Sequence, residues 1–199
     1  MPADIPTPHL THHFLIAMPS LEDSVFERSV VYVCEHSLNG ALGLIINKPT
    51  DLMLPELFER IELNFGREDL REMPVLLGGP VQTERGFVLH DPMRGTDAAS
   101  NESGYASTLR IAGGLDMTTS KDVLEALSSG VGPRRVLVTL GYAAWGEGQL
   151  ESELAKNTWL TVEANADLIF DTPIEQRYDG ALGLLGLESW RLAPQAGHA

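Results

Sequence analysis

The sequence predicts a single α+β domain with a mixed, mostly antiparallel sheet. Short runs of β-branched and aromatic residues recur along the chain, as is typical of strands. Helical spacing of apolar residues appears between some of these runs, without the regular strand–helix alternation of a parallel α/β sheet. The 199 residues are enough for one well-cored domain, and no linker rich in Pro, Gly and Ser divides them.

The first half of the chain is predicted to be mainly strands. Five apolar runs predict strands at residues 13–18, 29–35, 41–46, 75–77 and 86–90. Asn39-Gly40 is a strong turn signal, so the second and third strands are expected to form a hairpin. Apolar residues at helical spacing predict one helix over residues 52–63.

The second half mixes strands with helices. Three further strands are predicted at residues 107–112, 136–140 and 159–162. Thr119, with Asp122 three residues later, predicts the start of a helix. Leu150 and Leu154 stand one helical turn apart and predict another. Thr172-Pro173 followed by Glu175 predicts a capped last helix with proline at its first position.

The domain is expected to span residues 11–190. Residues 1–10 carry three prolines and read as a loose N-terminal segment, and residues 191–199 read as a loose tail. Residues 91–104 hold little to bury and are predicted to form an exposed, mobile loop.

Charge restricts the partners that the protein is expected to have. The chain has 28 acidic and 14 basic residues, for a formal net charge of −14. Because affinity for nucleic acids comes largely from Lys and Arg, direct binding to DNA or RNA is disfavoured, and so is binding to anionic membranes. Arg134-Arg135 is the only adjacent basic pair, and a direct DNA-binding role needs a folded basic patch around it. Protein partners are therefore expected.

Cys34 is the only cysteine, so no intramolecular disulfide forms, which suits a reducing compartment. No stretch approaches the ~20 apolar residues that span a bilayer, and the start of the chain lacks the basic and apolar regions of a secretory signal. A cytoplasmic location is the simplest expectation.

One candidate pocket is predicted from Cys34, Glu35, His36, His90 and Asp91. In a regular strand Cys34 and His36 point to the same face, where the imidazole can activate a thiolate. The alternative is a small thiol buried in a strand. The spacing of these residues is not that of a zinc site, so we expect no metal and no cofactor. No catalytic residue is assigned.

Three long strings resemble the AlgH/YqgE family of bacterial proteins: AMPSLEDSVFERSVVYVCEHSLNGALGLIINKP (17–49), GGPVQTERGFVLH (78–90) and LGYAAWGEGQLESELAKNTWL (140–160). The resemblance implies a branched sheet curled into a pseudo-barrel with flanking helices. The family name links it to transcriptional regulation of alginate production, and it implies no enzymatic activity and no catalytic residues.

Three hypotheses follow for the function. The first is a non-catalytic regulatory or binding protein that acts through protein contacts. The second is a small-ligand binder or enzyme with a pocket near Cys34, His36 and His90. The third is a regulator that binds DNA directly.

Overall fold

The computed structural model describes residues 9–92 and 104–192. Residues 1–8, 93–103 and 193–199 lie outside these ranges. They make up most of the N-terminal segment, of the 91–104 loop and of the C-terminal tail predicted from the sequence. The described residues form ten strands: β1 (His13–Ala17), β2 (Val30–Ser37), β3 (Gly40–Ile45), β4 (Pro49–Met53), β5 (Pro74–Leu77), β6 (Val81–His90), β7 (Thr108–Ile111), β8 (Leu115–Thr118), β9 (Val136–Trp145) and β10 (Trp159–Glu163). The helices in these ranges are α1 (Leu54–Arg60), α2 (Asp122–Ser128), α3 (Gln149–Ala155), α4 (Ala166–Phe170), α5 (Arg177–Leu184) and α6 (Ser189–Leu192), with 3₁₀ turns η1 (Glu68–Leu70) and η2 (Ile174–Gln176).

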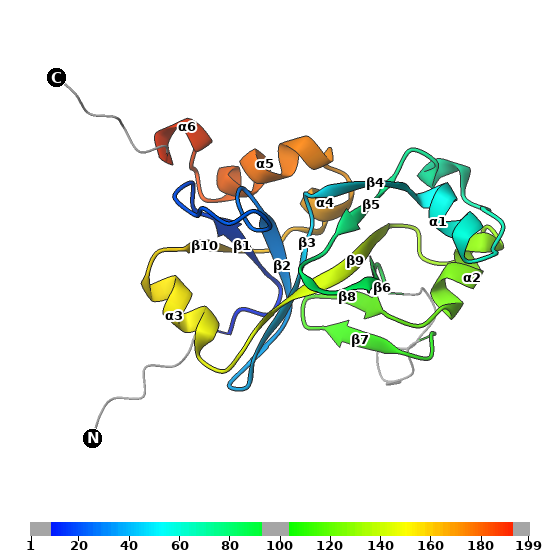
Figure 1. The fold of residues 1–199 in the computed structure, drawn as a ribbon, viewed down its shortest axis with the longest axis horizontal. Coiled ribbons are helices and arrows are strands. Elements are labelled where there is room, and N and C mark those ends of the chain that lie inside the picture. Colours follow the sequence, from blue (N-terminus) through cyan, green and yellow to red (C-terminus); the bar gives the residue numbers. More distant parts are fainter. Residues whose placement is uncertain (1–8, 93–103, 193–199) are drawn as a thin grey trace.

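The strands form one curled, branched sheet in the order β10-β1-β2-β3-β9-β6-β8-β7, and β4 and β5 branch from it at β9. Every pairing is antiparallel except that of β5 with β9. The predicted α+β class with a mostly antiparallel sheet is therefore confirmed, and the sheet curls into a half-barrel with flanking helices. Helices α1 and α2 lie together at one end of the molecule, and α3 lies at the other (Figure 1).

Strand β9 joins the two halves of the sheet. Residues of β9 between 136 and 142 pair with β5 and β6, and residues 143–145 pair with β3. The turn between β5 and β6 passes so close to β9 that a Cβ on Gly79 would lie 2.1 Å from the Tyr142 carbonyl carbon. Gly79 and Gly141 also have positive φ angles, of 155° and 74°. Glycine at both positions thus permits the branch.

Three apolar cores fill the space between sheet and helices. One contains Phe14 and Tyr32 and packs against α4 and α5. A second contains Val33 and Trp145 and includes Leu150 of α3. The third lies under α1 and α2, which are the helices that position the candidate site.

The sequence predictions of several elements are corrected by the structure. Pro173 has extended backbone (φ −52°, ψ 140°) and precedes the 3₁₀ turn, so it is not the first residue of a capped α-helix. The Thr172 hydroxyl donates to the Asp167 carbonyl at 3.4 Å instead of capping a helix. Strands β4 and β8 and helix α4 were not predicted, and α1 starts at Leu54 because β4 occupies the residues before it.

Candidate functional site

The prediction that Cys34 and His36 share a face of their strand is wrong, because a β-bulge interrupts β2. The register with β3 shifts between Val33 and Glu35. The extra residue reverses the alternation of the side chains. Cys34 therefore lies in the core that contains Tyr32, while His36 points to the other face of the sheet. Glu35 is exposed.

Cys34 is a buried thiol with 2% of its surface exposed. Its Sγ donates to the Tyr32 carbonyl oxygen at 3.7 Å. Burial raises the pKa of the thiol far above its ordinary value, with a smaller contribution from the charge of Glu35. Because the thiolate is the nucleophilic form, this burial disfavours a nucleophilic role for Cys34.

The His36 side chain makes hydrogen bonds to Leu10, near the N-terminal end of the described residues, and to Glu151 of α3. Its Nδ1 accepts a hydrogen bond from the Leu10 backbone N–H at 3.1 Å, so the ring proton is on Nε2. Nε2 donates to the Glu151 carboxylate at 2.8 Å. Leu10, at the end of the segment expected to be loose, is 4% exposed. This arrangement uses both ring nitrogens in structural bonds.

His90 and Asp91 lie at the end of β6, and the side chain of each has its own partners. His90 Nδ1 is 2.7 Å from the Asp91 carbonyl oxygen, which can only accept, so Nδ1 carries the proton. His90 Nε2 then accepts from the Thr118 hydroxyl at 2.8 Å. The Asp91 carboxylate accepts two hydrogen bonds from Arg135, at 2.9 and 3.0 Å.

The five predicted site residues therefore form two separate groups. Strands β2 and β6 are separated in the sheet by β3 and β9. His90 and Asp91 are brought together, but Cys34 and His36 do not join them. In the described ranges no group of three or more His, Cys, Asp or Glu side chains is placed to hold a metal ion.

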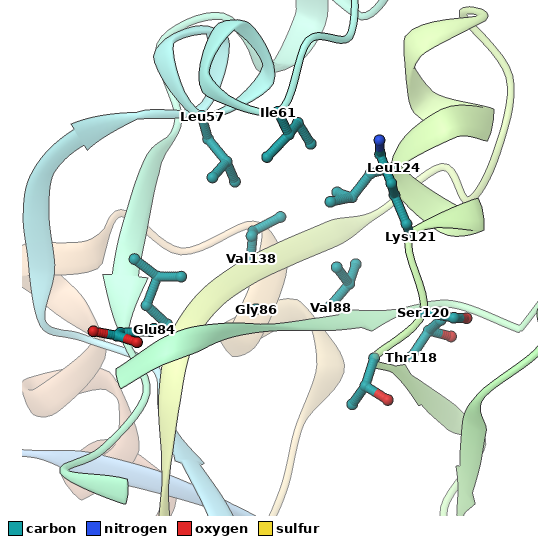
Figure 2. A pocket seen from close by; sticks show the side chains of 12 residues that line it. Leu57, Ile61, Glu84, Gly86, Val88, Thr118, Ser120, Lys121, Leu124 and Val138 are labelled. Atoms are coloured by element: carbon teal, nitrogen blue, oxygen red, sulfur yellow. The ribbon is translucent and has the colours of Figure 1, made fainter. Parts of the chain in front are cut away.

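A pocket of about 210 Å³ lies elsewhere, between α1 and α2 and above β6 and β9. We call it the α1–α2 pocket (Figure 2). It is lined by Leu57, Ile61, Glu84, Gly86, Val88, Thr118, Thr119, Ser120, Lys121, Leu124, Val138 and Leu140. In Figure 2, Leu57 of α1, Ile61 just after this helix and Leu124 of α2 project toward the floor formed by Val88 and Val138.

The pocket arises because each helix carries a second apolar stripe beside the one that it buries. Helix α1 buries Leu54 and Phe58 against the sheet. Leu57 and Ile61, four residues apart, remain half-buried on the adjacent face. Helix α2 repeats this arrangement, since it buries Val123 and Leu127 and leaves Leu124 half-buried. The two half-buried stripes face the same gap.

Gly86 deepens the pocket. It has no positive φ angle and no atom lies within 4 Å of the position that its Cβ would occupy. Neither backbone conformation nor close approach therefore requires glycine here. The missing side chain leaves open space above β6.

The polar groups of the pocket are of two kinds. The hydroxyl groups of its wall already have hydrogen-bond partners, and two charged side chains lie at its rim. The Thr118 hydroxyl is bonded to His90 and Thr108, and the Ser120 hydroxyl donates to Asp122. Lys121 and Glu84 lie at opposite ends of the pocket (Figure 2). Neither makes an ion pair with any other residue in the described ranges. The interior thus offers mainly apolar contact, with one charge of each sign at the rim.

The structure and the pocket together define an α+β protein with a half-barrel sheet and a small, mainly apolar pocket. A family model described as AlgH-like matches residues 14–190, and the chain belongs to this family. The UPF0301 proteins of Acidovorax sp. (strain JS42) and Variovorax paradoxus (strain S110) are 69% and 67% identical to it, over the full length of both chains in each case.

Solved structures agree with the family assignment. The solution structure of the AlgH protein from Pseudomonas aeruginosa is 45% identical, with a TM-score of 0.74 and full coverage of both chains. A crystal structure of a Corynebacterium diphtheriae protein is 21% identical, with a TM-score of 0.65, covering 96% of this chain and 90% of that one, and shows the shared fold alone. Among the described residues, no helix is long and apolar enough to span a bilayer.

Proposed function

We propose that this protein is a non-catalytic regulatory protein of the cytoplasm that binds other proteins through the α1–α2 pocket. The observation that carries the proposal is the pocket itself, which is small and mainly apolar and is bordered by two charges that have no ion-pair partner among the described residues. Its volume of about 210 Å³ is below the ~300–1,000 Å³ of pockets that enclose a drug-sized ligand. It suits one large apolar side chain of a partner.

A single inserted side chain is a common way for a protein interface to gain affinity. A few anchors seated in desolvated pockets dominate the energy of many interfaces, while the contacts around them exclude water. Here the half-buried leucine and isoleucine side chains of α1 and α2 supply the walls of such a pocket. The cytoplasmic setting fits Cys34, which is a free thiol.

The proposal is tested with a displayed library of random linear peptides and the full-length protein. Gly86→Leu fills the pocket, and Gly183→Leu is the matched control, because neither glycine has a positive φ or a neighbour within 4 Å. We expect the wild type to enrich peptides that share a large apolar residue. Synthetic copies should bind Gly183→Leu normally and Gly86→Leu at least tenfold more weakly in fluorescence anisotropy. Equal binding to both variants would refute a role for the pocket.

A second candidate function is a small-ligand enzyme, and one observation favours it. Thr118 lines the pocket and its hydroxyl is 2.8 Å from His90 Nε2, while His90 Nδ1 donates to the Asp91 carbonyl. A hydroxyl, a base and an orienting group in this order resemble an activated nucleophile. Thr118 is, however, fully buried and its hydroxyl also bonds to Thr108. We therefore rank this function second.

The two functions make different predictions for activated acyl esters. A nucleophilic Thr118 should be acylated, and mass spectrometry of the digested protein would find the acyl group on the peptide that contains it. The Thr118→Val variant serves as the control. We expect no acylation of Thr118 in the native protein, because its hydroxyl is inaccessible.

A further inference from the structure

The rim of the α1–α2 pocket carries one positive and one negative side chain, which bear on the residues that flank the apolar anchor of a bound segment. Lys121 begins α2 as its N-cap residue, and its ammonium group lies beside the pocket opening (Figure 2). Glu84 projects from β6 at the other end of the pocket. Both residues are exposed. A bound segment that crosses the opening therefore meets a cation at one end and an anion at the other.

Two other carboxylates near these elements already have partners. The Asp122 carboxylate, next to Lys121, accepts from the Ser120 hydroxyl and from the backbone N–H groups of Ala106 and Val123. On α1, the Glu56 carboxylate accepts from the Met53 backbone N–H. Lys121 and Glu84 have no such bonds within the described ranges, so both side chains can engage a partner.

We infer that the partner is a linear protein segment with one large apolar side chain flanked by an acidic residue, which meets Lys121, and a basic residue, which meets Glu84. This inference rests on the proposed function and names the partner chemistry of the same pocket. Complementary charges at the rim of an interface select partners and fix their orientation, and like charges reject wrong ones. A second copy of this chain is a poor occupant, because each copy carries a net charge of −14.

The test uses three defined peptides with a central leucine, flanked by one acid and one base, by two acids, or by two bases. Peptides with alanine at the centre measure binding that does not need the anchor. Affinities are measured by anisotropy at physiological salt, where charges more than about 8 Å apart are largely screened. We expect the wild type to prefer the mixed peptide by about two- to fivefold, the range of exposed charge pairs.

Charge-reversal variants give the sharper readout. Lys121→Glu leaves two anions at the rim and should prefer the peptide with two bases, whereas Glu84→Lys should prefer the peptide with two acids. The controls Lys156→Glu and Glu147→Lys make the same changes in net charge at exposed positions just after and just before α3. They should keep the wild-type preference for the mixed peptide.

The outcomes separate the inference from the function on which it rests. If leucine-centred peptides bind in a way that Gly86→Leu abolishes, but the rim variants behave like their controls, the charge pattern is refuted and the pocket stands. If no leucine-centred peptide binds more tightly than its alanine counterpart, the proposed function itself fails. A reversal of preference in the two rim variants alone supports the inference.

Discussion

Individual side chains in this protein show how burial decides chemistry. Cys34 and His90 were both expected in a pocket, yet each is nearly inaccessible and bonded to its surroundings. Their residue types could be read from the sequence, but their environments depend on a bulge and on pairings between distant strands. A residue's type suggests what it can do, and packing decides whether it does so.

The buried thiol predicts slow alkylation. Because burial raises the pKa of Cys34, iodoacetamide at mildly alkaline pH should label the native protein at least a hundredfold more slowly than the guanidinium-unfolded chain. Mass spectrometry over time measures both rates. Rapid labelling of the native protein would restore the thiolate hypothesis.

His90 predicts a loss of stability in mild acid. Burial lowers the pKa of His90 below its ordinary 6.5, so the unfolded chain binds a proton first as the pH falls. The free energy of unfolding should therefore decline from pH 6.5 toward about pH 5, before most carboxylates titrate. His12, whose pKa burial also lowers, adds to the effect. Denaturant titrations should show a smaller decline for His90→Gln, and an unchanged decline would contradict this account.

At the scale of elements, the hairpin of β2 and β3 was predictable, because Asn39-Gly40 lies between two apolar runs. Strand β8 was missed because it is only four residues long and follows Gly113-Gly114, whose positive φ angles make a tight turn back from β7. The pocket could not be predicted. The apolar spacing of residues 52–63 does not distinguish Leu57 from Phe58. Only the position of α2 in the fold shows that Phe58 packs in the core and Leu57 lines the pocket.

Arg135 predicts a large effect from one substitution between elements. Its guanidinium connects Asp91 after β6 with Asp167 and Asp171 in and after α4. Arg135→Met leaves three carboxylates together without their cation and should lower the free energy of unfolding by about 1–3 kcal/mol. The exposed neighbour gives the control, as Arg134→Met should change it by less than about 0.5 kcal/mol. Similar values for the two variants would show that the network contributes little.

At the scale of the whole molecule, the charge argues against direct DNA binding. Arg135, one member of the only adjacent basic pair in the sequence, forms ion pairs with three carboxylates, which weakens any basic patch that it could form with Arg134. We expect no saturable binding to duplex DNA in low-salt anisotropy titrations, because counterion release needs a cationic surface. Tight binding that salt abolishes would overturn the preference for protein partners.

Strand β9 has a consequence for how the molecule comes apart. Strand β9 is hydrogen-bonded to β3 on one side of the sheet and to β5 and β6 on the other. If either side separates from β9, the sheet therefore loses hydrogen bonds that β9 makes. Opening should therefore be cooperative, and slow hydrogen exchange should extend evenly from β2 across to β6. The strands on the two sides of β9 would then unfold together as one cooperative unit. The pocket would keep its shape until the entire domain unfolds.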